Sequence, residues 1–170
     1  YEKECIHMVT FLLSLLAILG ISLMLFSVVA LIQDKRLMGS APKEAQELVQ
    51  DKPERFKGQH ILGWALLIAG LLMLIADFVI AIWDGVSNGF AFRQFFARFL
   101  IILYVYKAYD MICFDFLLMT RSHFFEHYYP ELEGVEAYNK YGFNLKRQII
   151  RIILYPFICA FAAWICTMIW

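Results

Sequence analysis

The hydrophobic residues of this chain fall into four long, nearly unbroken runs, and most charged residues lie between them. The runs cover residues 8–32, 61–83, 99–120 and 149–170. An apolar run of about 18 or more residues is typical of a transmembrane helix, because in lipid only a helix or a closed barrel satisfies its own backbone hydrogen bonds. The runs lack the period-two alternation of barrel strands. The pattern therefore predicts an all-α integral membrane protein: a single domain, residues 1–170, built as a bundle of four transmembrane helices.

The composition agrees with this class of protein. Of the 170 residues, 62% are hydrophobic and 18% are charged, against about 45–50% and about 25% in soluble domains. The net charge is zero and the basic residues are scattered, which excludes the one-sided basic patch of a nucleic-acid-binding protein. The four cysteines form no C-x-x-C pair and predict neither a disulfide framework nor a thiol-redox site. The expected partner is the lipid bilayer.

Lys and Arg between the runs predict the orientation, because loops rich in these residues remain in the cytoplasm. One side carries 11 of them: Lys35, Arg36, Lys43, Lys52, Arg55, Lys57, Arg121, Lys140, Lys146, Arg147 and Arg151. The other side carries only 3: Lys3, Arg93 and Arg98. We therefore expect loops 33–60 and 121–148 to be cytoplasmic, and both termini to be non-cytoplasmic in a multi-pass protein.

The second run carries a regular pattern of small and acidic residues. Gly63, Gly70, Asp77 and Asp84 recur every seven residues and drift by only about 20° per step around a helix, so they share one face. Small residues on a face allow a neighbouring helix to approach closely. This face is expected to turn Asp77 into the bundle, or to bind another membrane protein along Gly63 and Gly70.

The third run contains three ionisable residues, Lys107, Asp110 and Asp115, at depths where lipid hydrocarbon is expected. One such side chain costs roughly 2.5–3.5 kcal/mol at the bilayer centre, so these need partners or water. Asp77 is expected at a depth similar to that of Lys107, and Lys107 and Asp110 are i, i+3 neighbours. We predict an Asp77–Lys107–Asp110 cluster. Asp115 lies about 140° around an α-helix from Asp110 and has no basic partner in its own run.

Two interpretations of these charges remain open. Intramembrane ionisable residues often mark an ion or proton pathway or a polar substrate site, with Asp115 as the group that exchanges protons. Alternatively, Lys107 neutralises its acidic neighbours and the cluster only holds the helices in register. The aromatic and basic segment 85–98 fits either an interfacial helix or the start of the third span.

A second motif follows the third run. His123, Glu126 and His127 match H-x-x-E-H, in which two histidines on one helix face bind zinc and the glutamate acts on the bound water. The pattern is short, and only Glu131, Glu133 and Glu136 follow closely as a further acidic ligand. An ordinary interfacial cluster without metal fits the same residues.

The leading functional prediction is a transport or channel-like component, with Asp77, Lys107, Asp110 and Asp115 along its pathway. It is expected to be an oligomer or to join a membrane-protein partner, because four short spans enclose little space alone. One alternative is an interfacial membrane enzyme for a lipid-type substrate, with Glu126 catalytic and zinc held by His123 and His127. The other is an accessory subunit of a membrane complex.

Overall fold

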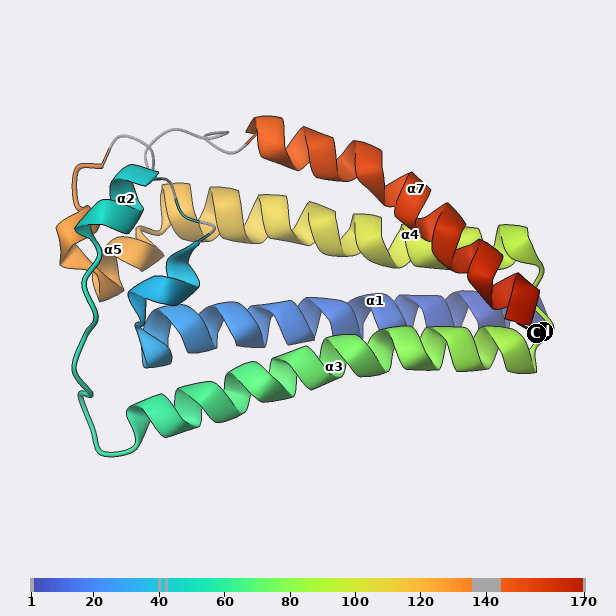
Figure 1. The fold of residues 1–170 in the computed structure, drawn as a ribbon, viewed down its shortest axis with the longest axis horizontal. Helices are drawn as coiled ribbons and strands as arrows, with labels where there is room; N and C mark the ends of the chain where they lie inside the picture. The colour runs from blue at the N-terminus through green and yellow to red at the C-terminus, as the bar shows by residue number, and fades with distance from the viewer. Residues whose placement is uncertain (1, 40, 42, 136–144, 170) are drawn as a thin grey trace.

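The computed structural model describes residues 2–39, 41, 43–135 and 145–169, and its regular elements are all helical. Four helices are long: α1 (Glu2–Phe26), α3 (Gln59–Ser87), α4 (Phe92–Tyr109) and α7 (Leu145–Ile169) (Figure 1). Two of them continue as π-helices, α1 into η1 (Ser27–Ile32) and α4 into η3 (Asp110–Arg121). The segment 85–98 thus contains the start of the third long helix.

Three helices are long and apolar enough to cross a membrane. They are His7–Ile32, Gln59–Ser87 and Leu145–Ile169, and they match the first, second and fourth predicted runs. The third predicted span corresponds to α4 and η3, whose charged residues lower its hydropathy. The structure therefore confirms an all-helical fold with three potential membrane spans and leaves the fourth span a prediction.

α1, α3 and α4 run lengthwise beside one another, and α7 is inclined to them (Figure 1). α1 packs along α3, α4 packs on α1, and α7 crosses α4 (Figure 1). α1 begins and α7 ends at the same end of the molecule, which we call the terminal end. The opposite, loop end carries the short helices η2 (Lys35–Met38), α2 (Lys43–Leu48), α5 (Phe124–Tyr128) and η4 (Pro130–Leu132).

Glycines bring α1 and α3 into close contact. A Cβ on Gly70 would lie 2.7 Å from the carbonyl oxygen of Gly20 and 2.7 Å from Cγ of Met24, and one on Gly63 would lie 2.7 Å from Cγ1 of Ile32. The predicted small-residue face therefore exists, but α1 and η1 of the same chain cover it. This corrects the expectation that Gly63 and Gly70 receive another protein.

Two separate clusters of buried apolar residues form the core. One fills the terminal half of the bundle and includes Ala81, Phe95, Phe99, Ile102 and Cys159. The other lies beneath the short helices of the loop end: Val29, Met38, Ala41, Ala45, Val49, Met119, Phe125, Tyr129 and Leu132. The buried apolar core is therefore divided between the two ends of the bundle.

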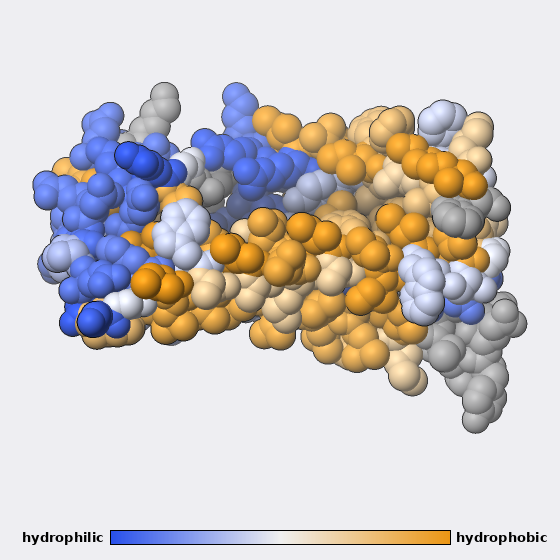
Figure 2. All heavy atoms as spheres, turned by 60° about the horizontal axis from the view of Figure 1, so that its bottom comes forward, coloured by the Kyte–Doolittle hydropathy of each residue, from blue (hydrophilic) through white to orange (hydrophobic). Residues whose placement is uncertain are grey.

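Apolar side chains also cover much of the outer surface, and hydrophilic residues gather at the loop end (Figure 2). On α3, Ile61 is 76% exposed and Trp83 is 71% exposed. Such exposure is unfavourable in water and normal in lipid. Exposed Trp64 and Trp83 lie on α3 at a separation of about 28 Å, at 1.5 Å per residue. This spacing suits tryptophans at the two faces of a bilayer.

Candidate functional site

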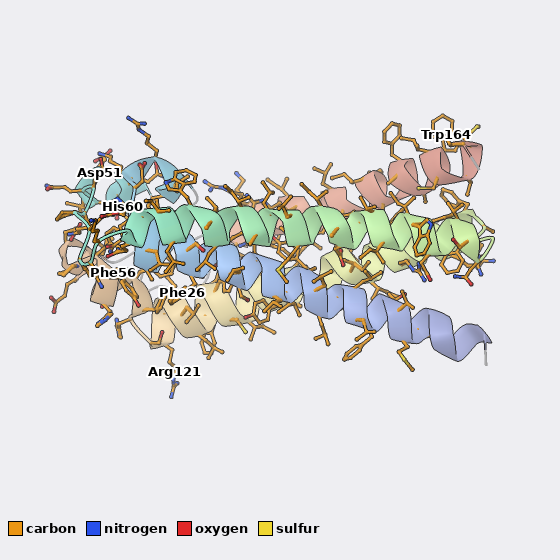
Figure 3. The ribbon with its side chains drawn as sticks, turned by 90° about the horizontal axis from the view of Figure 1, so that it is seen from below. Phe26, Asp51, Phe56, His60, Arg121 and Trp164 are labelled. Atoms are coloured by element: carbon orange, nitrogen blue, oxygen red, sulfur yellow. The ribbon has the colours of Figure 1, made fainter. Side chains whose placement is uncertain are left out.

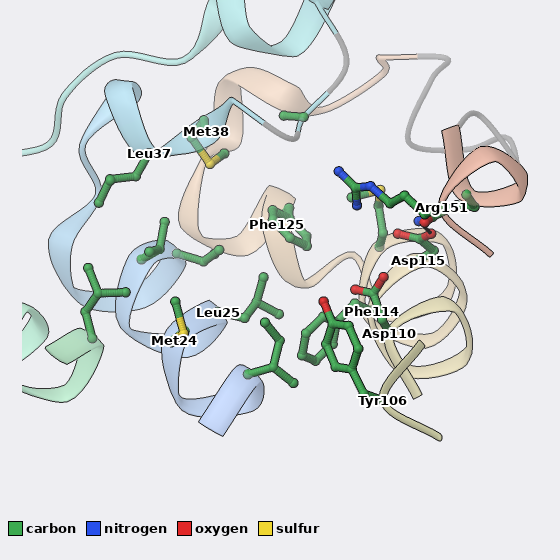
Figure 4. A pocket seen from close by; sticks show the side chains of 17 residues that line it. Met24, Leu25, Leu37, Met38, Tyr106, Asp110, Phe114, Asp115, Phe125 and Arg151 are labelled. Atoms are coloured by element: carbon green, nitrogen blue, oxygen red, sulfur yellow. Dashed lines mark hydrogen bonds between the residues drawn. The ribbon is translucent and has the colours of Figure 1, made fainter. Parts of the chain in front are cut away.

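A cavity of about 260 Å³ lies between α1 with η1, α4 with η3, and α7. Its volume is close to the lower end of the range for small-molecule sites, about 300–1,000 Å³. One wall is apolar and includes Met24, Leu25 and Met38 (Figure 4). The opposite wall carries the polar side chains Tyr106, Asp110, Asp115, Gln148 and Arg151. Figure 2 shows a hollow in the surface with hydrophilic residues inside it.

The π-helical winding of η3 brings both of its acidic residues to this cavity. In a π-helix the hydrogen bonds join residues five apart, so residues i and i+5 return to nearly the same face. The cavity face of η3 carries Asp110, Phe114, Asp115 and Met119, spaced i, i+4, i+5 and i+9. This corrects the expected angle of about 140° between Asp110 and Asp115, which assumed an α-helix.

Lys107 and Asp110 form the ion pair that their i, i+3 spacing predicts. The Lys107 side chain is almost fully buried, so its charge needs this partner. Asp77 is also fully buried, but it forms no ion pair with Lys107 and does not line the cavity. Among the described residues, neither carboxyl oxygen of Asp77 has a hydrogen-bond partner. The structure therefore joins two members of the predicted three-residue cluster.

Asp115 has a partner that sequence reasoning missed. The side-chain amide of Gln148 on α7 donates a hydrogen bond to Oδ2 of Asp115 at 2.8 Å. Gln148 is only 3% exposed, and its Oε1 is buried without a hydrogen bond in the described part of the chain. The available signal was the spacing of Gln148 and Arg151, which places two polar side chains on one face of the last span.

Arg151 is an exposed residue of α7 whose side chain lines the cavity near Asp110 and Asp115 (Figure 4). It forms no ion pair with any described residue. In the sequence, Arg151 contributes only to the excess of basic residues that predicts the orientation. Its guanidinium carries five N–H donors that can bind a carboxylate or a phosphate in bidentate fashion.

The tyrosines of α4 have different surroundings. Tyr106 lines the cavity. The hydroxyl of Tyr109 is hydrogen-bonded to Ser22 at 2.9 Å, and that of Tyr104 donates to the carbonyl oxygen of Ile152 at 3.3 Å. The latter two bonds connect α4 to α1 and to α7.

The H-x-x-E-H residues do not share one helix face. His123 lies before α5 with a left-handed φ of 51°, and its Nδ1 is 2.6 Å from Oε2 of Glu126. The ring of His127 packs edge-on against Tyr128. Among the described residues, no group of three or more His, Cys, Asp or Glu side chains is arranged to hold a metal ion. The predicted arrangement of two helical histidines around zinc is therefore not formed.

At the terminal end, Arg98 is buried between α3 and α4. Its Nη1 lies 2.7 Å from Oδ2 of Asp84 and donates to the carbonyl oxygen of Ala81 at 3.0 Å. The guanidinium carbon lies 4.3 Å from the ring centre of Phe90. These contacts connect the end of α3 to the start of α4.

Comparisons with protein-family models, with curated proteins and with solved structures found no match.

Proposed function

We propose that this chain is a membrane transport component with four spans, and that its solute binds in the cavity at the loop end of the bundle. The observation that carries the proposal is the polar wall of Asp110, Asp115, Gln148 and Arg151, which faces a cavity between helices with largely apolar outer surfaces. Ionisable residues at membrane depth are costly and usually mark a substrate or ion site.

The surface of α4 and η3 supports the fourth span. Their exposed side chains include Ile101, Val105, Ile112, Phe116 and Leu117. The charged residues in the middle of this segment face the opposite way: Lys107 is buried, and Asp110 and Asp115 line the cavity. The exposed Arg93 and Arg121 lie at its two ends. A helix with this distribution can contact lipid on one side and the bundle on the other.

The loop end is proposed to be cytoplasmic, because the excess of Lys and Arg lies there. The cavity would then open toward the cytoplasmic half of the membrane. The terminal half is closed by the apolar cluster around Phe95, Phe99 and Ile102. This arrangement corresponds to one of the two states of a transporter, with the site accessible from one side only.

The alternatives have less support. The enzyme alternative needs His123 and His127 on one face of a helix, and they are not so arranged. The accessory-subunit alternative used the Gly63 and Gly70 face, which α1 and η1 cover. The expectation of an oligomer depends on the small space that four spans enclose. The cavity lies within a single chain, so the proposed site does not need a second copy.

Labelling with a membrane-impermeant thiol reagent tests the transport role without knowledge of the solute. Two variants, each with its new cysteine as the only one, are reconstituted in vesicles. Asp115→Cys is expected to react rapidly from the loop side. Ile102→Cys, in the closed terminal half, is expected to react slowly from the terminal side, because a transporter must open that half during its cycle.

A variant that keeps only native Cys113 is the matched control, since Cys113 is on η3 but does not line the cavity. It should react more slowly than Asp115→Cys. If Ile102→Cys never reacts from the terminal side while Asp115→Cys reacts from the loop side, the protein binds a ligand without transporting it. If Asp115→Cys also fails to react, the cavity is not an aqueous site.

A further inference from the structure

We propose that the cavity selects a zwitterionic amphiphile, in which a primary ammonium group binds Asp115 and a phosphate or carboxylate group binds Arg151. This inference rests on the cavity as the ligand site of the proposed function, and adds the class of ligand. It follows from the charges around the cavity, from the polarity of its two walls and from its size.

The charges of the cavity are not all compensated within the protein. Lys107 neutralises Asp110 through their ion pair. Asp115 accepts a hydrogen bond from Gln148, which is uncharged. Arg151 forms no ion pair with a described residue. One negative and one positive charge therefore face the same cavity without being paired to each other.

A ligand with both charges would compensate both residues. A primary ammonium group has three N–H donors for the oxygens of Asp115. The amide of Gln148 already donates to one of these oxygens, Oδ2, and a carboxylate oxygen can accept more than one hydrogen bond. The guanidinium of Arg151 matches the geometry of phosphate and carboxylate oxygens. Asp115 is half-buried and Arg151 is exposed at the mouth of the cavity, so a ligand with one charge would engage only one of the two residues, whereas a zwitterion can engage both.

The opposite wall favours an apolar group on the same ligand. Met24, Leu25, Val28, Leu37 and Met38 line it, and methionine side chains adapt to apolar groups of varied shape. A cavity of about 260 Å³ can hold a headgroup and the first part of a chain. The same polar chemistry occurs in phosphoethanolamine lipids and in small soluble zwitterions, and the apolar wall favours the lipid.

Competition between single-chain lipids tests the proposal. The purified wild-type protein in detergent is offered equal amounts of lysophosphatidylethanolamine, lysophosphatidic acid, lysophosphatidylcholine and an alkylamine of similar chain length. Native mass spectrometry counts the bound molecules. We expect lysophosphatidylethanolamine to be bound at least tenfold more than each of the others. The choline headgroup has no N–H to donate, so it tests the hydrogen bonds to Asp115.

Two variants separate the contributions of the charges. In Arg151→Gln the preference over the alkylamine should disappear, because the anionic group loses its partner. In Asp115→Asn the preference over lysophosphatidic acid should disappear. Arg147→Gln is the matched control, since Arg147 is exposed on the same helix and does not line the cavity, and it should keep both preferences.

The outcomes answer three separate questions: which class of ligand binds, whether the ligand is a lipid or a small soluble molecule, and whether the protein transports it. Equal binding of all four lipids, or equal effects of Arg151→Gln and Arg147→Gln, would overturn the proposal. Soluble phosphoethanolamine that competes as well as the lipid would show that the source is a small zwitterion and not a lipid. Selective binding in a protein whose Ile102→Cys never reacts would reject transport and keep the ligand class.

Discussion

At the scale of single residues, Glu131 connects two segments of the loop end outside the membrane helices. Nζ of Lys52 donates to its Oε2 at 2.6 Å, and the backbone N–H of Gln50 approaches its Oε1 at 3.4 Å. Partial burial raises the pKa of Glu131, whereas the hydrogen bonds from Lys52 and from backbone N–H groups lower it. The lowering effects together are larger, so the pKa lies below its usual value. The ionised form is therefore the one that the fold stabilises.

The sign of this shift predicts how acid affects the loop end. Since the pKa is lower in the folded state, the contribution of Glu131 is present above its unfolded pKa and is lost as the pH falls through its folded pKa. We expect Glu131→Gln to lower the free energy of unfolding by about 1 kcal/mol or less at pH 7. Thermal unfolding of wild type and variant should converge at low pH. A difference that persists there would contradict the ion-pair explanation.

Asp77 presents the opposite situation, a buried carboxyl without a hydrogen-bond partner among the described residues. An ionised carboxylate in such a place is costly. Asp77→Asn keeps the shape and cannot ionise, so we expect stability to be equal to wild type or higher, as measured by the thermal unfolding midpoint. A loss of more than about 2 kcal/mol would show instead that the carboxylate has a partner.

At the scale of elements, the contact between α1 and α3 depends on glycine. Gly70→Val would place side-chain atoms where the carbonyl oxygen of Gly20 and the side chain of Met24 already lie. Overpacking of this kind typically costs about 1–3 kcal/mol, and we expect a lower midpoint of thermal unfolding. Gly39→Ala is the control, because its Cβ meets no atom within 4 Å. Similar losses in both variants would contradict close packing as the cause.

The winding of η3 makes a second prediction at this scale. In a π-helix, positions 110 and 115 share the face that lines the cavity. In an α-helix, position 113 would lie nearer to the face of position 110 than position 115 does. With one cysteine per variant, a water-soluble thiol reagent should label positions 110 and 115 rapidly and Cys113 slowly. Rapid labelling at 110 and 113 with slow labelling at 115 would indicate α-helical winding.

At the scale of the whole molecule, charged and apolar surfaces divide along the helix axes. Asp51, Phe56, His60 and Arg121 lie near the loop end, and Trp164 lies near the terminal end (Figure 3). This division predicts which positions lie on the same side of the membrane. Positions before and after α4 and η3 also test whether this segment crosses the membrane. If it did not cross, the segments on either side of it would lie on the same side of the membrane.

Three exposed positions, each the only cysteine of its variant, test this topology in cells. An impermeant thiol reagent should label Ser87→Cys, at the terminal end, in intact cells. Glu47→Cys and Glu133→Cys, both at the loop end, should react only after permeabilisation. Labelling of Glu133→Cys together with Ser87→Cys would show that α4 and η3 do not cross. Labelling of Glu47→Cys in intact cells would reverse the orientation.

The sequence by itself determined the helices and one of their contacts. Each apolar run lies on one long helix, because a helix in lipid must satisfy its own backbone, but α1 and α4 begin six and seven residues before their runs, at Glu2 and Phe92. The seven-residue spacing of Gly63 and Gly70 predicted a close helix contact, and Lys107 and Asp110 are neighbours on any helix. These features depend only on residues close together in the chain.

Only the tertiary structure decided the rest of the candidate site. α-Helical and π-helical winding use the same residues, and the choice between them places Asp115 either away from Asp110 or beside it. The hydrogen bond from Gln148 to Asp115 joins residues 33 positions apart, and no local pattern specifies which faces of two distant helices meet. The cavity exists because α1, η3 and α7 come together around it. Its charges can therefore be interpreted only once those three helices are placed.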